Sequence, residues 1–213
     1  MTIAELSAFF AMGLGLGMLH AFDPDHLAAV GGIASGNLNH NNSTLGRQPL
    51  NTPWQYAIHW SLGHGSSLFA IALMVLLIGT VIPTQVSHLA EQSVALVLII
   101  IGGHALWRIT EVKPARPTRR SLTGASMVGL LHGTAGSAPL LALIPLSRIS
   151  HPAVGLVYVL FFSAGVTIAM TSIGGAMTQV IRQIGRFDTI WQQSLQVGLA
   201  LFSLILGIYL LFS

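Results

Sequence analysis

The chain has 213 residues, of which 53% are hydrophobic and only 7% are charged, whereas soluble globular domains carry about a quarter charged residues. This composition excludes a water-soluble fold, and it also excludes disordered, collagen-like and coiled-coil chains. Nine Lys and Arg residues against six Asp and Glu are too sparse for a nucleic-acid-binding surface, so we expect no nucleic-acid partner. Because cysteine is absent, the chain is neither a disulfide scaffold nor an iron–sulfur protein.

Six apolar stretches are each long enough to cross a lipid bilayer, which takes about 20 residues. The stretches are residues 4–33, 54–80, 89–109, 121–147, 153–180 and 190–212. We therefore expect an all-α integral membrane protein with six transmembrane helices in a single domain, residues 1–213. The first stretch is too long for one straight helix and contains Pro24, so we expect this helix to be broken near Pro24.

The positive charges predict the orientation of the chain. Eight of the nine Lys and Arg residues fall on one side of the predicted membrane, and only Arg148 falls on the other. Positive charge is retained in cytoplasmic loops. We therefore expect both termini outside and loops 36–53, 111–120 and 181–189 in the cytoplasm, in a prokaryotic cytoplasmic (inner) membrane.

A short internal repeat relates the two halves of the chain, residues 1–110 and 121–213. Gly-Met-Leu-His at 17–20 resembles Gly-Leu-Leu-His at 129–132, and Ser-Leu-Gly at 61–63 resembles Ser-Ala-Gly at 163–165. With three helices each, the halves would have opposite orientations in the membrane. The pattern suggests a 3+3 inverted repeat, an arrangement that is common in transporters.

The first apolar stretch contains a group of potential metal ligands: His20, Asp23, Asp25 and His26. Ionisable side chains are costly inside a membrane and mark functional sites. Residues three apart share a helix face, which links Asp23 with His20 and with His26. Pro24 cannot donate an N–H to the carbonyl of His20, so we expect the helix to open there and the side chains to converge. Imidazole and carboxylate without thiolate suit divalent nickel, cobalt or zinc.

Two further histidines are candidate ligands. His64 lies in the second stretch between Gly63 and Gly65, which permit a close approach between helices. His132 lies in a glycine-rich part of the fourth stretch and would face His20 if the repeat is real.

The other histidines have simpler interpretations. His59 lies about 140° around the helix from His64, so we do not expect both to face one ion. His104 is more typical of a hydrogen-bonding link between helices, and those in or beside loops are expected to be solvated: His40, His88 and His151. The alternative for residues 20–26 is a membrane-edge cap with solvated carboxylates.

The order of these motifs resembles that of the nickel/cobalt transporter family. His-Ala-Phe-Asp-Pro-Asp-His-Leu at 20–27 resembles the family signature on a transmembrane helix, and Ser-Leu-Gly-His at 61–64 resembles its second motif. The resemblance implies nickel or cobalt transport, with His20, Asp25 and His26 in the metal-recognising positions and His64 in support. With six predicted helices, the chain is most similar to the shorter relatives, which include urease- and hydrogenase-associated membrane proteins.

These observations predict uptake of a divalent metal ion, nickel or cobalt, by a transporter that is not an enzyme. The ion would be the transported substrate, and we expect no cofactor. A homo-oligomer or an accessory subunit is a possible partner; Gly13, Gly15 and Gly17 form a small-residue face suited to helix packing. Two alternatives stay open: metal efflux, and an intramembrane metalloprotein or haem protein with histidine ligands.

Overall fold

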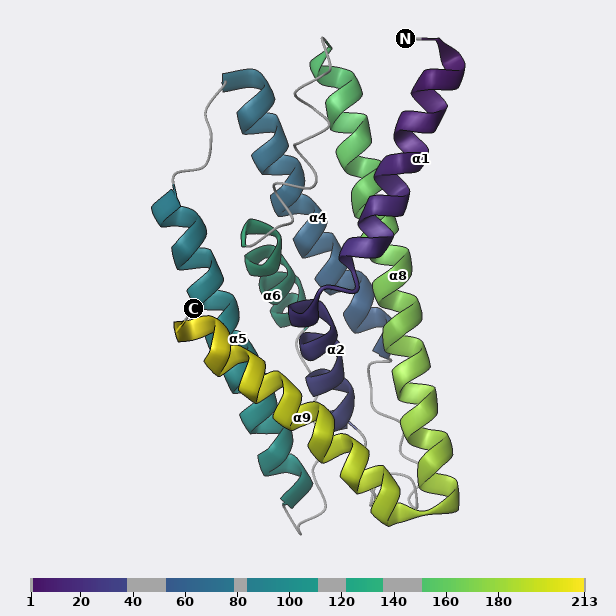
Figure 1. Ribbon diagram of the computed structural model, residues 1–213, viewed down its shortest axis with the longest axis vertical. Helices are drawn as coiled ribbons and strands as arrows, with labels where there is room; N and C mark the ends of the chain where they lie inside the picture. The colour runs from purple at the N-terminus through teal and green to yellow at the C-terminus, as the bar shows by residue number, and fades with distance from the viewer. Residues whose placement is uncertain (1, 38–52, 79–83, 111–121, 136–150, 213) are drawn as a thin grey trace.

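The structure is a computed structural model that describes residues 2–37, 53–78, 84–110, 122–135 and 151–212. Within these ranges the chain forms seven α-helices and no strand (Figure 1). The helices are α1 (Ile3–His20), α2 (Pro24–Asn37), α4 (Pro53–Ile78), α5 (Thr84–Thr110), α6 (Leu122–Thr134), α8 (Pro152–Phe187) and α9 (Thr189–Phe212).

The predicted break of the first helix near Pro24 is confirmed, and it consists of residues 21–23. Helix α1 ends at His20 and α2 begins at Pro24, a position where proline is favoured because the first N–H of a helix has no partner within it. In the intervening turn, the backbone N–H of Asp23 donates to the carbonyl oxygen of His20 at 3.0 Å. The turn thus supplies the hydrogen bond that Pro24 cannot make.

Five of the described helices are long and apolar enough to cross a membrane: α1, α4, α5, α8 and α9. Helix α2 continues the path of α1 through the bundle (Figure 1). The fourth predicted stretch is described only as α6, which has 13 residues, and its remainder lies outside the described residues. The architecture is that of an all-α membrane protein, and the count of six transmembrane helices stays a prediction.

One predicted loop is wrong. Residues 181–187 of the expected loop 181–189 continue α8, and Asp188 alone separates α8 from α9. Polarity suggested a loop, but Gln and Arg are good helix formers and no proline interrupts them. Asp188 ends the helix in an extended conformation, and its carboxylate accepts from the backbone N–H of Ile190 at 2.7 Å. The predicted loops 36–53 and 111–120 lie almost entirely outside the described residues.

The most extensive contacts between described helices are those of α4 with α6, α5 with α9, α4 with α8, and α1 with α8. Helix α2 contacts α5, α8 and α9, so the segment after the break lies among other helices. In three of these pairs, α1–α8, α4–α6 and α5–α9, the helix backbones approach each other at glycines. A Cβ atom at Gly17 would overlap the backbone of Phe162, and one at Gly129 would overlap the backbone of Trp60. The absence of side chains there lets the helix backbones touch.

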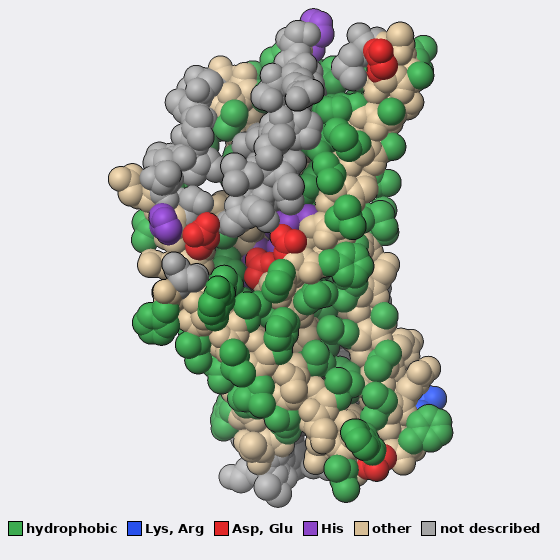
Figure 2. All heavy atoms as spheres, in the orientation of Figure 1, with side chains coloured by type: hydrophobic (Ala, Val, Ile, Leu, Met, Phe, Trp, Pro, Cys, Tyr) green, Lys and Arg blue, Asp and Glu red, His purple; other side chains and the backbone are tan. Residues whose placement is uncertain are grey.

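The outer surface fits a lipid environment. Hydrophobic side chains are spread over the face seen in Figure 2, and many large ones are exposed on α5, α8 and α9. An apolar surface this extensive is rare on a soluble monomer. The described arginines are Arg108, Arg182 and Arg186, and they lie near the ends of α5 and α8, which share the lower end of the bundle in Figure 1.

Candidate metal site

Three buried histidines from three helices meet where α1 gives way to α2. His20 ends α1, His26 lies in the first turns of α2, and His64 lies in the middle of α4. The ring centroids are 4.6 Å apart for His20 and His26, 5.5 Å for His20 and His64, and 5.2 Å for His26 and His64. One nitrogen of each ring lies within 4.8 Å of the others, so the three could hold a metal ion. We call these three residues the histidine cluster.

The local sequence explains why the rings converge. The turn at residues 21–23 places His20 and His26 on either side of the break instead of two turns apart along one straight helix. Ala21 is fully buried and leaves space beside the rings. On α4, Gly63 brings the backbone into contact with Ser126 of α6, and this close packing buries His64 completely.

The two carboxylates contact the Nδ1 atoms of the cluster. Nδ1–H of His26 donates to Oδ1 of Asp25 at 3.0 Å, and Nδ1 of His20 lies 2.8 Å from Oδ2 of Asp23. The contact at His26 leaves the lone pair of the ring on Nε2, as in the carboxylate–histidine–metal arrangement of many metalloproteins. Asp23 and Asp25 are thus placed to orient and polarise imidazole ligands.

The carboxylates also connect the cluster to the surface. The side chains of Asp23 and Asp25 are 33% and 28% exposed, whereas those of His20 and His26 are 2% and 1% exposed. Figure 2 shows acidic side chains with histidine beside them at mid-height of the molecule. A cation that arrives from this face meets negative charge before it meets the imidazoles.

His132 lies beside the cluster at the end of α6. Its ring centroid is 5.7 Å from that of His26, and the residue is buried. Nδ1–H of His132 donates to the carbonyl oxygen of Val128 at 3.0 Å, which leaves the lone pair on Nε2. The structure therefore places a fourth imidazole next to the three that already share a site.

The buried nitrogens of these rings are available to bind a ligand. Within the described part of the chain, Nε2 of His20, His26 and His132 and both nitrogens of His64 have no hydrogen-bond partner. A buried polar group left in this state costs about 1–3 kcal/mol. Several in one place are rare unless they bind something, and neutral imidazoles with free lone pairs bind divalent metal ions.

The remaining histidines lie apart from the cluster. Nδ1–H of His59 donates to the carbonyl oxygen of Gln55 on its own helix at 2.8 Å. His104 is exposed and contacts Trp107, and His88 and His151 are exposed as well. His40 lies outside the described residues.

Trp60 is a neighbour of the site that the sequence analysis missed. Its ring stacks on His64 with the planes 9° apart and the centroids 5.1 Å apart, and it also contacts His26 at 4.9 Å and His132 at 5.4 Å. The signal was available, because residues four apart on a helix lie one above the other. Trp60 therefore had to stand next to whatever His64 binds.

The contact between Asp25 and His26 leads to a prediction. In Asp25→Asn the side chain keeps its shape but loses the charge that holds and polarises the ring of His26. Loss of such a partner costs about 10–100-fold in metal affinity, and we expect a decrease in that range, measured by equilibrium binding of Ni²⁺ to the purified protein. Glu91→Gln on α5 is the control, because Glu91 contacts only the exposed His88 in the described structure. Equal affinity in Asp25→Asn and Glu91→Gln would contradict the assigned role.

Comparisons with known proteins do not establish the family of this chain. The chain is 26% identical over 182 residues to the urease accessory protein UreH of Bacillus sp. (strain TB-90), which covers 79% of this chain and 75% of that protein. No protein-family model matches the sequence. No solved structure matches it either.

Proposed function

We propose that the protein carries a divalent transition metal ion, nickel or cobalt, across the membrane. The observation that carries the proposal is the convergence of His20, His26 and His64, three buried imidazoles with nitrogen atoms that lack hydrogen-bond partners. Such groups inside a membrane bundle mark the path of a transported ion. The metal is the substrate of the protein, taken up at the cluster and released from it.

The donor atoms support a borderline transition metal. Imidazole nitrogen suits nickel, cobalt and zinc, whereas a site for magnesium or calcium would be built from oxygen ligands. His132 can supply a fourth nitrogen if its ring moves towards His26. Asp23 and Asp25 offset part of the positive charge of the ion through the rings that they contact.

Two independent comparisons support the choice of nickel or cobalt. The motifs at residues 20–27 and 61–64 resemble those of the nickel/cobalt transporter family, whose shorter members include urease-associated membrane proteins. The relative found by sequence comparison is named as a urease accessory protein. We therefore propose delivery of metal to a metalloenzyme maturation system as the purpose of the transport.

Inward transport is the favoured direction. A divalent ion that moves into a cell gains about 2.3 kcal/mol per charge for each 100 mV of inside-negative potential, so uptake needs no further energy source. The described arginines near the ends of α5 and α8 support the orientation with this end of the bundle in the cytoplasm. Efflux is the alternative, and it requires a coupled ion.

The contact between the rings favours a bare ion over haem. The imidazoles of His20, His26 and His64 touch one another, with centroids 4.6–5.5 Å apart. Axial ligands of haem stand on opposite faces of the porphyrin, which would have to fit between the rings. A single metal ion needs only small shifts of the same side chains.

Transport in proteoliposomes tests the proposal. Vesicles that contain the protein take up radioactive Ni²⁺ or Co²⁺, and a potential that is negative on the inside accelerates uptake in the fraction of molecules inserted in the correct orientation. Empty vesicles and vesicles with His26→Ala serve as controls. Uptake no faster than in empty vesicles would contradict transport. In cells, sensitivity to nickel that increases on gene deletion would indicate efflux instead.

Metal binding should depend on pH, because protons and metal ions compete for the same imidazole lone pairs. We expect Ni²⁺ binding to weaken as the pH is lowered from about 8 to about 4, because a protonated imidazole cannot bind a metal ion. Equilibrium binding to detergent-purified protein measures this without the influence of a pH gradient. Constant affinity over this range would exclude imidazole as the main donor.

A further inference from the structure

Two buried aromatic residues flank the histidines in equivalent ways. Trp60 of α4 contacts His132 at the end of α6, with ring centroids 5.4 Å apart. Phe162 of α8 contacts His20 at the end of α1, with ring centroids 5.6 Å apart. Each aromatic residue thus contacts the histidine near the end of the helix that packs against its own helix.

The backbone contacts around these residues repeat in the same way. Gly17 meets the backbone of Phe162 as Gly129 meets that of Trp60. The reciprocal contacts repeat as well: Gly165 meets Leu14 and Met18, and Gly63 meets Ser126 and Leu130. In both sets, α1 corresponds to α6 and α8 corresponds to α4, with a constant difference in residue number for each correspondence. The motif matches of 17–20 with 129–132 and of 61–63 with 163–165 have the same differences.

In the third helix pair, α5 and α9, the two helices are equivalent to each other. Gly102 of α5 meets Ala200 and Leu204 of α9, and Gly207 of α9 meets Ala95 and Ile99 of α5. Each residue of one contact corresponds to a residue of the other: Gly102 to Gly207, Ala95 to Ala200, and Ile99 to Leu204. The difference in residue number is the same for all three correspondences. A two-fold relation between the halves of the chain accounts for all three pairs, and an inverted repeat requires the axis to lie in the plane of the membrane.

Trp60 and Phe162 lie on opposite sides of the histidines. Trp60 is one turn nearer than His64 to the beginning of α4, and Phe162 lies beside Gly17, one turn nearer than His20 to the beginning of α1. Helices α1 and α4 run in opposite directions through the bundle (Figure 1). The two aromatic rings therefore bracket the histidines along the direction in which an ion crosses.

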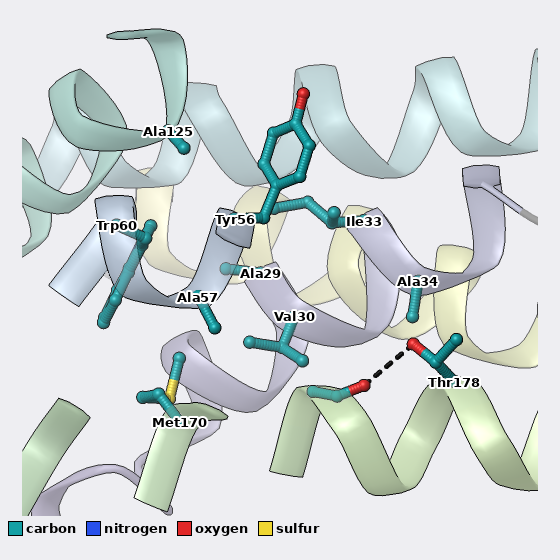
Figure 3. Close-up of a pocket in the computed structure, with 11 residues that line it drawn as sticks. Ala29, Val30, Ile33, Ala34, Tyr56, Ala57, Trp60, Ala125, Met170 and Thr178 are labelled. Carbon is teal, nitrogen blue, oxygen red and sulfur yellow. Dashed lines mark hydrogen bonds between the residues drawn. The ribbon is translucent and has the colours of Figure 1, made fainter. Parts of the chain in front are cut away.

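A small apolar cavity lies on the Trp60 side. Its volume is about 30 Å³, room for one or two water molecules and not for a hydrated ion. Figure 3 shows Trp60 at one end of the lining and Thr178 of α8 towards the other, with Val30, Ala57 and Met170 between them. The hydroxyl of Thr178 donates to the carbonyl oxygen of Gly174 at 2.8 Å, so the lining offers little to a cation. Trp60 separates this cavity from the histidines.

We propose that Trp60 and Phe162 are the two gates of the transport path, equivalent residues of an inverted repeat that close the histidine cluster on opposite sides. The inference rests on the proposed function and adds to it the residues that control passage. An apolar constriction blocks ions by excluding water. In transport, one ring moves aside at a time, and the ion is exposed to only one side of the membrane.

The test uses Trp60→Ala, Phe162→Ala and the double variant in proteoliposomes preloaded with radioactive Ni²⁺. Equilibrium binding of Ni²⁺ in detergent is measured for all three, and binding should persist because neither residue supplies a donor atom to the ion. Passive Ni²⁺ leakage should be at least about tenfold faster in the double variant than in either single variant, because both constrictions are open. Matched controls are Trp107→Ala and Phe161→Ala, which remove exposed aromatic side chains.

A second measurement does not depend on metal binding. The chain has no cysteine, so Ala57→Cys places one thiol in the cavity beyond Trp60. With both aromatic residues present, a small membrane-impermeant thiol reagent should label this cysteine from one side of the membrane only, in the step of the transport cycle that opens the cavity to that side. In the Trp60→Ala/Phe162→Ala background it should label from both sides. Trp60→Leu and Phe162→Leu replace the alanine variants if these do not fold, with the same expected direction.

The outcomes distinguish a failure of the proposed gates from a failure of the proposed transport function. Double-variant leakage equal to that of the single variants, or one-sided labelling in the double variant, would overturn the gates even where wild-type protein binds and transports nickel. Loss of Ni²⁺ binding in the single variants would also contradict the gate assignment, and it would indicate that Trp60 and Phe162 shape the metal site. Absence of Ni²⁺ binding by wild-type protein would overturn the proposed function instead, while the labelling pattern would still report on the constrictions.

Discussion

Replacement of His26 by Ala should abolish high-affinity nickel binding and uptake. The ring of His26 contacts those of His20, His64 and His132 at centroid distances of 4.6, 5.2 and 5.7 Å, so it is the shared member of the site. Loss of a group that only orients a ligand already costs about 10–100-fold in affinity, and loss of the ligand itself should cost more. Equilibrium dialysis with Ni²⁺ measures the change in purified protein.

The histidine series defines the ligand set. We expect His20→Ala and His64→Ala to behave as His26→Ala does, and His132→Ala to give a smaller loss, because His132 lies beside the cluster. His59→Ala is the matched control on α4, since His59 bonds to its own helix through the carbonyl of Gln55. Wild-type metal content in His26→Ala, at a normal level of folded protein, would end the assignment of this site.

A single methyl group at Gly129 should destabilise the bundle strongly. A Cβ atom there would overlap the backbone carbonyl of Trp60 and crowd the backbone nitrogen of His64. Because backbone atoms cannot rotate away as a side chain can, α4 and α6 would have to separate. Overpacking of this kind costs about 3 kcal/mol, and thermal unfolding in detergent should show Gly129→Ala melting well below wild type.

Gly15 and Gly103 provide the controls for this prediction. No described atom lies within 4 Å of a Cβ built on either residue. Since alanine is the better helix former by up to about 1 kcal/mol, Gly15→Ala and Gly103→Ala should be neutral or stabilising. If Gly129→Ala melted at the same temperature as Gly15→Ala, α4 and α6 would not be in backbone contact.

The main features near the break followed from local chemistry. Proline lacks an N–H, so a helix that contains Pro24 had to open close to that residue, and it does so at residues 21–23. The small residue at Gly63 indicated a close approach of helices, and α4 does contact α6 there. Such signals depend on one residue and its neighbours in the chain, which is why sequence alone contains them.

Features that depend on rotamers and on distant helices were not accessible in the same way. The sequence predicted that carboxylates and imidazoles would come together, but it did not specify that Asp23 and Asp25 would contact the Nδ1 atoms of His20 and His26. That choice depends on side-chain torsions around the turn. The contact of Phe162 with His20 needed the packing of α8 on α1, which no local pattern specified. The end of α8 was missed for a different reason, since polarity alone does not end a helix.

The origin of the ligands in three separate helices has a consequence for binding strength. An ion held by His20, His26 and His64 fastens α1, α2 and α4 together, so its binding energy adds directly to the stability of the closed bundle. The same fastening opposes any movement that parts these helices. The proposed transport therefore requires an affinity that is weak enough for the ion to dissociate in each cycle, and turnover should be fastest at moderate affinity.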